Sequence, residues 1–292
     1  MMRGEILLTD RCNFRCPYCR GLEAKGDIDF GIAVQTLVTW GNDHLKNVRF
    51  SGGEPTMYKR LGDLVEIAKN LGVERIAVST NGSRPWHVYK NLLAAGVNDF
   101  SVSLDACCAA DAKKMAGGVD RWERVTSNLR RMSEQCYTTV GIVLTQDNIA
   151  QAERTIEFAH SLGVADIRVI PAAQESRALS QLKVSDEILS AHPILSYRID
   201  RANRGLAIRG ATDVPRCHLV KDDSAVSGRY HYPCVIYLRE RGKPIGEVSS
   251  EMRKERFAWF ERHNPSKDPI CRQNCLDVCV EFNHKCEHAS LS

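Results

Sequence analysis

The sequence has no long hydrophobic run and no export signal. Its first residues, MMRGEILLTD, lack the apolar stretch of a signal peptide. None of the later apolar runs approaches the roughly 18 residues that a membrane-spanning helix needs. We therefore expect a cytoplasmic protein that has no membrane partner.

The sequence also carries little net charge. Its 40 Lys and Arg residues against 36 Asp and Glu residues leave a formal charge of +4, and no basic patch stands out. This balance gives no support to a nucleic-acid partner. Hydrophobic residues make up 43% and charged residues 26%, which is typical of a packed globular enzyme and excludes a disordered chain.

Short apolar, β-branched runs predict six strands, which alternate with stretches typical of helices. The strand runs are 5–9, 47–51, 75–80, 99–104, 138–145 and 166–171. The helical stretches are 31–45, 61–72, 86–96, 121–135 and 150–163. This alternation predicts right-handed βαβ units and an α/β fold, a partial (β/α)6 TIM-like barrel with a mainly parallel sheet.

The strand–helix alternation fades after about residue 172. We predict a core barrel over residues 1–175, a helical connection over 176–212, and a small cysteine-rich C-terminal extension over 213–292. Ligand sites of parallel α/β folds gather at the carboxyl ends of the strands. The polar motifs that follow the first four strands should therefore face one cavity.

The twelve cysteines are unevenly spread: three fall within residues 12–19, and six lie beyond residue 216. Because cytosolic thiols stay reduced, metal binding explains this grouping better than disulfides. Cys12, Cys16 and Cys19 form C-x3-C-x2-C directly after the first strand. Three thiolates on a four-iron cluster leave one iron open to a small molecule. A structural zinc site is the alternative, although zinc normally takes four closed ligands there.

This motif, with Tyr18 before its last cysteine, resembles the signature of the radical S-adenosylmethionine (radical SAM) superfamily. The resemblance implies a [4Fe–4S] cluster on Cys12, Cys16 and Cys19 that binds S-adenosylmethionine. Reductive cleavage would give a 5′-deoxyadenosyl radical, which abstracts hydrogen from the substrate. The resemblance also implies an electron donor such as flavodoxin or ferredoxin.

Other segments that follow strands resemble cofactor contacts of this superfamily. The GGE motif of Gly52, Gly53 and Glu54 is implied to contact the methionyl amino group, and its glycines permit close approach of a ligand. Short polar residues at strand ends are also common turn formers, so each contact has a purely structural alternative. The implied contacts are Tyr18, Gly52, Gly53, Glu54, Ser79, Asn81, Ser103, Asp105, Arg168 and Ile170.

The tail resembles the SPASM or twitch extensions of the superfamily, which carry one or two auxiliary iron–sulfur clusters. A full SPASM set has seven cysteines and a C-x2-C step, whereas this tail has six and lacks that step. One auxiliary cluster with spare thiols is therefore an alternative to two. A zinc knuckle with His218, His231, His284 or His288 is another. The candidate cluster ligands are Cys217, Cys234, Cys271, Cys275, Cys279 and Cys286.

The sequence does not name the substrate. Family analogy favours a ribosomally made peptide, although no separate peptide-recognition domain precedes the first predicted strand. The alternative is a nucleotide, nucleoside or other small molecule, as in the molybdenum-cofactor cyclase that shares the barrel-plus-twitch plan. A third interpretation, of a different class, is a non-catalytic iron–sulfur electron carrier.

Overall fold

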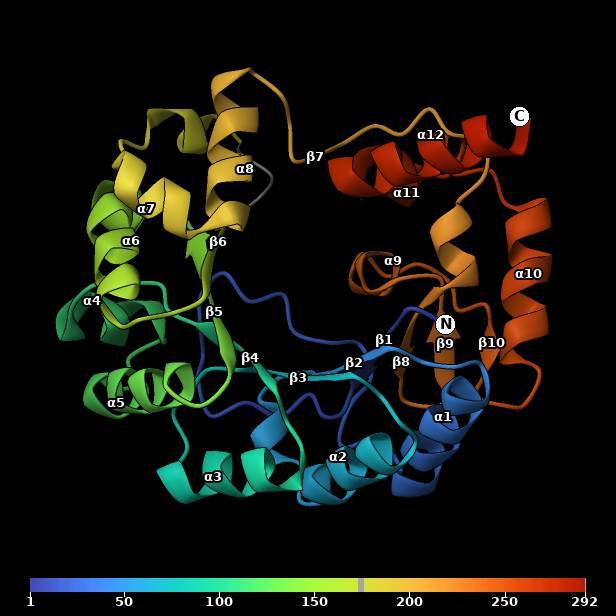
Figure 1. The fold of residues 1–292 in the computed structure, drawn as a ribbon, viewed down its shortest axis with the longest axis horizontal. Coiled ribbons are helices and arrows are strands. Elements are labelled where there is room, and N and C mark those ends of the chain that lie inside the picture. Colours follow the sequence, from blue (N-terminus) through green and yellow to red (C-terminus); the bar gives the residue numbers. More distant parts are fainter. Residues whose placement is uncertain (173–175, 292) are drawn as a thin grey trace.

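Six parallel strands form a curved sheet in chain order, as Figure 1 shows for this computed structural model, which describes residues 1–172 and 176–291. Each strand begins within two residues of a predicted run, which confirms the partial barrel. The strands are β1 (Arg3–Leu7), β2 (Asn47–Ser51), β3 (Arg75–Thr80), β4 (Asp99–Ser103), β5 (Tyr137–Leu144) and β6 (Asp166–Pro171).

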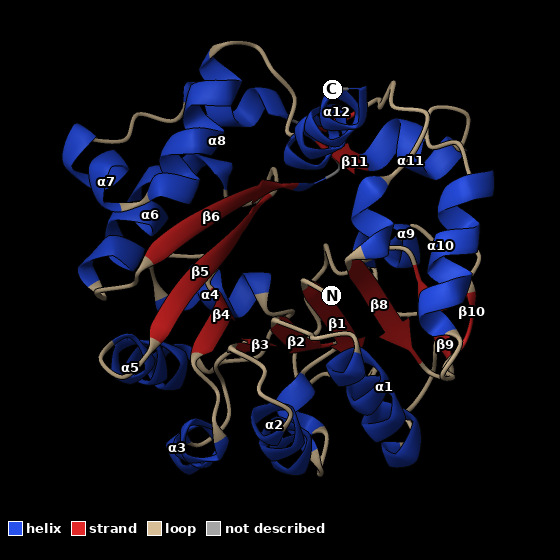
Figure 2. Cartoon of the chain, turned by 45° about the vertical axis from the view of Figure 1, so that its right-hand side comes forward, coloured by secondary structure: helices blue, strands red, loops and turns tan. Residues whose placement is uncertain are grey.

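Helices cover the outer face of this sheet (Figure 2). They are α1 (Phe30–Asn42), α2 (Leu61–Asn70), α3 (Trp86–Ala95), α4 (Ala109–Met115), α5 (Trp122–Ser133) and α6 (Ala152–Ser161), with 3-10 turns η1 (Pro55–Met57) and η2 (Ile149–Gln151). The sequence pattern predicts all six helices except α4, whose only buried residue is Met115. A helix that buries one side chain has no apolar period to detect. Among the described residues, no helix combines the length and apolar character needed to cross a membrane.

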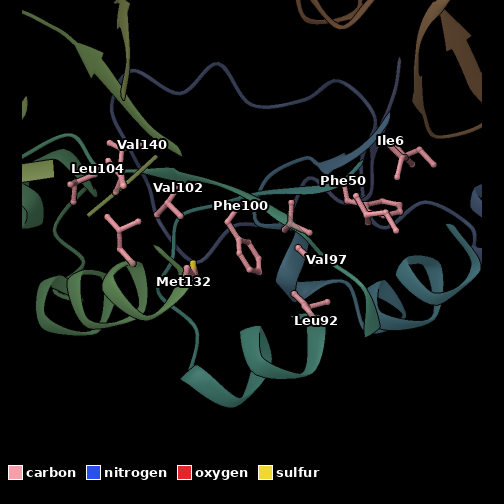
Figure 3. Close-up of a cluster of buried hydrophobic side chains, with 14 of the residues drawn as sticks. Ile6, Phe50, Leu92, Val97, Phe100, Val102, Leu104, Met132 and Val140 are labelled. Atoms are coloured by element: carbon pink, nitrogen blue, oxygen red, sulfur yellow. The ribbon is translucent and has the colours of Figure 1, made fainter. Parts of the chain in front are cut away.

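The hydrophobic core lies between the sheet and the outer helices, as the side chains in Figure 3 show. Phe50, Phe100 and Val102 point from their strands into this core and are fully or almost fully buried. Because side chains alternate along a strand, the residues between them face the interior of the barrel. That interior is polar, since it receives Arg49 and Ser101 from the same strands.

The C-terminal region continues the same sheet. After β6, η4 (Ser176–Gln181), α7 (Asp186–Ala191) and α8 (Pro193–Asn203) occupy the segment for which the sequence predicts a helical connection. The strand β8 (Asp223–Ser227) then pairs in parallel with β1, and β9 (Tyr230–Tyr232) and β10 (Gly246–Glu247) extend the sheet to nine strands among the described residues. The predicted boundary near residue 213 therefore divides the sequence, but not the sheet.

The last helix, α12 (Asp277–Leu291), begins beside α8 at the other edge of the barrel, and the C-terminus lies at its far end (Figure 1). Arg201 of α8 pairs with Asp277 at 2.5 Å, and the Tyr197 hydroxyl donates to the same carboxylate at 2.6 Å. The tail thus pairs with the edge strand β1 through β8 and contacts α8, the helix that packs on the other edge strand, β6. Its remaining elements are β7 (Arg209–Gly210), η5 (His218–Lys221), α9 (Val235–Arg239), α10 (Met252–Arg262), α11 (Pro269–Asn274), β11 (Cys275–Leu276) and α12 (Asp277–Leu291).

Close packing of α1 on β1 predicts a specific sensitivity at Gly4. A Cβ atom there would overlap the ring of the fully buried Trp40. We expect Gly4→Ala to destabilise the fold by about 1 to 3 kcal/mol, because overpacking forces the ring off its site. Thermal unfolding measures this. Gly62→Ala is the matched control, since a Cβ at this helical position meets no atom within 4 Å; equal melting temperatures for the two variants would contradict the expectation.

Candidate active site

One cavity at the carboxyl ends of the strands collects most of the predicted site residues. This placement follows from the parallel sheet, in which the carboxyl ends of all strands meet at one edge. Three predicted contacts, Glu54, Arg168 and Ile170, do not line the cavity. The predicted residues that do line it are Cys12, Cys16, Tyr18, Cys19, Gly52, Gly53, Ser79, Asn81, Ser103 and Asp105.

The GGE turn holds one side of the cysteine loop by backbone contacts. The Gly53 N–H donates to the Thr9 carbonyl at 2.7 Å, and the Glu54 N–H donates to the Arg11 carbonyl at 2.8 Å. A Cβ atom at Gly53 would overlap the Arg11 carbonyl oxygen and lie 2.7 Å from that of Asp10. The close backbone of Asp10 and Arg11 therefore requires a glycine here, whether or not a ligand also approaches it.

The end of α4 holds the other side of the loop. The Arg15 N–H donates to the Ala116 carbonyl at 3.1 Å, and a Cβ atom at Gly117 would overlap the Arg15 carbonyl oxygen. Gly117 also has a φ of +68°, which favours glycine. Sequence reasoning missed this contact because α4 has no helical signal. The adjacent Gly117 and Gly118 are the only sign of it in the sequence.

The three thiols of the loop share one site. The Cys12 sulfur accepts from the Phe14 N–H at 3.4 Å and from the Asn81 side-chain amide at 3.8 Å. Burial raises the pKa of Cys12, and it raises the pKa of Cys16 to about 11; the nearby thiols of the loop add to both shifts. Because metal ions bind thiolates, loading this site would release protons.

Tyr18 and Asp105 connect the loop to the ends of two strands. The Tyr18 hydroxyl donates a hydrogen bond to the Asp105 carboxylate. The same carboxylate accepts from the Val143 N–H at 2.6 Å, and burial raises the pKa of Asp105 to about 6. The predicted site residue Asp105 thus fixes Tyr18 relative to β4 and β5.

Glu54 lies behind the wall of the cavity and is fully buried. Its carboxylate accepts from the Thr56 hydroxyl at 2.5 Å, the Thr80 hydroxyl at 2.7 Å and the Asn81 N–H at 2.7 Å. These bonds join the GGE turn to the end of β3. Glu54 therefore holds the wall together, and its contact with a cofactor stays a prediction.

The interior of the barrel holds a group of arginines. Arg49 donates to the Ser79 hydroxyl at 2.9 Å, and Arg168 donates to the Ser101 hydroxyl at 3.0 Å. Burial, followed by the charge of Arg49, lowers the pKa of Arg168. The Arg168 Nε is buried and has no hydrogen-bond partner among the described residues. Among the described residues, no carboxylate lies within 4.0 Å of Arg49, Arg168 or the neighbouring Arg198.

Sequence reasoning missed three polar groups in and beside this cavity. Glu5 of β1 lines the cavity and accepts from the Ser51 hydroxyl at 2.6 Å, and Arg239 of α9 lines it from the tail. Arg49 reaches it through Ser79. Strand alternation could have indicated Glu5 and Arg49, because each lies between two buried residues. Arg239 has no such signal, since it depends on how the tail folds back.

Five of the six tail cysteines gather in a second group. The thiols of Cys275 and Cys279 interact, and this interaction raises the pKa of Cys275 and lowers that of Cys279. Burial, together with the neighbouring thiols, raises the pKa of Cys217 to about 11 and that of Cys234 to about 12. Cys271 completes the group beside Cys234 and Cys217.

Cys286 lies farther along the last helix than Cys279. It lies on α12 seven residues beyond Cys279, which is about 10 Å along a helix. The structure thus offers five thiols at one place and does not divide the six cysteines into two sets.

Three of the four histidines named for the zinc-knuckle alternative have other partners in the structure. The His231 Nε2 lies 2.7 Å from the Glu255 carboxylate, and the His284 Nε2 lies 2.9 Å from that of Asp213. His218 packs against the ring of Phe260. Within the described residues, neither these three nor His288 falls in a group of three or more metal-binding side chains.

Comparison with known proteins identifies the family. The model of the radical SAM superfamily matches residues 6–159. Probable GTP 3′,8-cyclases from Metallosphaera sedula and Saccharolobus solfataricus are 28% and 30% identical over 174 and 173 residues. Each match covers 56% of this chain and 54% or 55% of the relative, so the chain spans about half the length of these curated relatives.

Solved structures share the fold at low sequence identity. The match to native anSMEcpe with bound AdoMet covers 99% of this chain and 95% of the anSMEcpe chain, with a TM-score of 0.63 and 14% identity. The match to Streptococcus suis SuiB bound to the precursor peptide SuiA covers 92% of this chain and 65% of the SuiB chain, with a TM-score of 0.59 and 16% identity. At this identity the likeness supports the barrel and its extension, and it does not identify a substrate.

The backbone contact at Gly53 leads to a testable expectation. Gly53→Ala should displace the cysteine loop, because the overlapping atoms are carbonyl oxygens that cannot rotate away. We expect the purified variant to lose most of the iron that the loop binds, while its circular dichroism stays close to wild type. Gly62→Ala, with open space at its Cβ, should keep its iron. Full iron content in Gly53→Ala would show that the contact is not needed.

Proposed function

Because this chain belongs to the radical SAM superfamily, we propose that Cys12, Cys16 and Cys19 hold its [4Fe–4S] cluster and that the barrel acts on an anionic small molecule. The family uses this cluster together with S-adenosylmethionine, and the chain is an enzyme of this type. The observation that carries the substrate proposal is the group of arginines inside the barrel, which lack ion-pair partners among the described residues.

The three thiols fit the cluster. They come from one loop, line one cavity, and lie close enough for their charges to affect one another. The backbone N–H of Phe14 and the side-chain amide of Asn81 donate to the Cys12 sulfur, and such donors stabilise a thiolate. Three thiolates suit a cubane that keeps one iron for a further ligand.

When bound, the reduced cluster supplies the electron that cleaves S-adenosylmethionine to methionine and a 5′-deoxyadenosyl radical. The protein binds and orients the cofactor at the cavity wall. Gly52 and Gly53 offer backbone without side chains there, and Ser79, Asn81 and Ser103 offer hydroxyl and amide groups for its ribose and carboxylate. The apolar lining excludes water from the reacting groups; it includes Phe14, Met115 and Trp122.

An anionic substrate would neutralise the interior arginines. Arg49 and Arg168 are next to the cofactor cavity, since Ser79 lines it and Ser101 is the neighbour of Ser79 in the sheet. Guanidinium groups bind phosphate and carboxylate through paired hydrogen bonds. Two of the similar proteins are probable GTP 3′,8-cyclases, and GTP is a nucleotide that carries phosphate groups. A phosphate-bearing nucleotide is therefore the substrate that this interior supports best.

The peptide substrate that family analogy favours has weaker support. Its support is the fold shared with SuiB, which binds its precursor peptide SuiA. For either substrate, the cluster requires a one-electron donor, and we propose flavodoxin or ferredoxin. The cytoplasmic location and the domain boundaries after residues 175 and 212 stay predictions.

The tail thiols fit one auxiliary iron–sulfur cluster. Four thiolates complete a [4Fe–4S] cubane, and five thiols gather at one place here. A second auxiliary cluster would need a further set of ligands, and Cys286 lies about 10 Å along α12 from Cys279. We therefore propose one auxiliary cluster rather than two.

Radical initiation can be tested directly. We expect the anaerobically reconstituted chain to form 5′-deoxyadenosine from S-adenosylmethionine with dithionite, and to hold about eight irons. Replacement of Cys12, Cys16 and Cys19 by Ala should abolish the product and leave about four irons in the tail. Product absent from an intact, fully loaded chain would favour the electron-carrier interpretation, and loss of all iron in the triple variant would contradict the auxiliary cluster.

The substrate proposal predicts a defined loss of affinity. Removal of one charged hydrogen-bond donor costs about 1.5 to 3 kcal/mol, so Arg168→Gln should weaken GTP binding roughly ten-fold or more. Isothermal titration with GTP and with inorganic triphosphate measures this in the holoenzyme. Arg60→Gln is the control, because Arg60 pairs with Asp63 on the outer helix α2. If GTP does not bind to the wild-type chain while 5′-deoxyadenosine still forms, the nucleotide substrate is rejected and the radical chemistry is not.

A further inference from the structure

The five gathered tail thiols exceed the four that a cubane needs by one, and Cys271 has a partner that the others lack. Its sulfur lies within 4.8 Å of an Asp268 carboxylate oxygen, whereas the thiols of Cys275 and Cys279 interact with each other. Cys271 is also near Cys234 and Cys217. It therefore lies between the thiol group and a carboxylate.

His263 completes a three-residue group with this pair. One ligand atom each of His263, Asp268 and Cys271 lies within 4.8 Å of the other two. Within the described residues, no other set of three or more His, Cys, Asp and Glu side chains meets this criterion. The donors are nitrogen, oxygen and sulfur, the set that zinc takes in proteins.

The spacing of His263 and Asp268 distinguishes the group from an ordinary ion pair. The His263 Nε2 lies 3.6 Å from the Asp268 Oδ2, too far for a hydrogen bond. The Nε2 is also buried and finds no hydrogen-bond partner in the part of the chain that the structure describes. Two ligands of one tetrahedral ion, with bonds of about 2.0 to 2.3 Å, are separated by roughly 3.3 to 3.8 Å. The observed distance fits a shared ion.

Neighbouring side chains fix the orientation of these ligands. The ring of His263 stacks on Trp259, with the centroids 3.8 Å apart. Asp268 caps α11 with one oxygen, which accepts from the Cys271 N–H at 2.9 Å. Its other oxygen accepts from the Tyr237 hydroxyl at 3.1 Å. A carboxylate that uses one oxygen as a cap keeps the second for an ion, and Tyr237 holds it in place.

We propose that His263, Asp268 and Cys271 bind a divalent zinc-type ion beside the auxiliary thiols. The fourth position of the ion is left to water or an exogenous ligand, as in zinc sites with three protein ligands. The auxiliary cluster then takes Cys217, Cys234, Cys275 and Cys279. This last assignment rests on the proposed auxiliary cluster; the ion site does not.

Metal analysis of the anaerobically reconstituted full chain tests the proposal. We expect about one zinc per chain, lost in His263→Gln and in Cys271→Ser, while iron stays at the wild-type level in both. Asp268→Asn should also lose zinc but keep its helix cap, since the amide oxygen still accepts. His284→Gln is the matched control: His284 is paired with Asp213 at 2.9 Å, without a third ligand, and its zinc should be unchanged.

A second measurement guards against variants that fold poorly. Cobalt(II) loaded into the wild-type chain should give the visible bands of a tetrahedral site with a thiolate ligand. The proposal would be overturned if neither zinc nor cobalt binds to the wild-type chain, or if His263→Gln retains its zinc. The loss of about four irons in Cys271→Ser would also overturn it, since Cys271 would then be a cluster ligand. Formation of 5′-deoxyadenosine depends on the N-terminal cysteines, so it separates these outcomes from failure of the proposed function.

Discussion

The position of the cysteine loop depends on close backbone contacts on both of its sides. The GGE turn after β2 contacts the carbonyl groups of Thr9 and Arg11, and Gly117 at the end of α4 contacts that of Arg15. Side chains could not fill these contacts, because any Cβ atom would overlap a carbonyl oxygen. Three connections of the barrel are therefore fixed relative to one another by main-chain contacts. Rigid support of this kind is what a site with three ligands from one loop needs, since the loop cannot hold its own geometry.

The period of two along the strands gives the barrel two different faces. Residues such as Phe50 and Phe100 enter the core with the helices, and their neighbours Arg49 and Ser101 enter the interior. Burial of charge without a close partner is costly, so natural proteins rarely keep it without a function. Arg49 and Arg168 instead rest on serine hydroxyls. The interior thus holds guanidinium groups beside the cavity, which Ser79 and the Glu5 carboxylate also line.

Much of this arrangement is readable from the sequence, for identifiable reasons. The six strands have strong apolar runs, and the cysteine motif and the GGE turn follow strands, so their meeting at one edge was predictable. The missing parts lack local signals. Helix α4 buries only Met115, and β8 joins the sheet through a pairing with β1 that spans more than 200 residues. The His263 group could not be found by spacing either, because its geometry comes from α9 and α10 packing together with the cap of α11.

The short helix α9 connects the two halves of the proposed chemistry. Cys234 caps its start, where its sulfur accepts from the Tyr237 N–H at 3.4 Å, and Arg239 at its end lines the cofactor cavity. Five helical residues rise only about 7 Å. A substrate that reaches Arg239 is then about one short helix away from the auxiliary thiols. Because β8, just before α9, is paired with β1, this separation is set by the same sheet that positions the cysteine loop. The auxiliary thiols and the cofactor cavity are thereby joined by one short helix, and Tyr237 on the same helix supports the neighbouring Asp268.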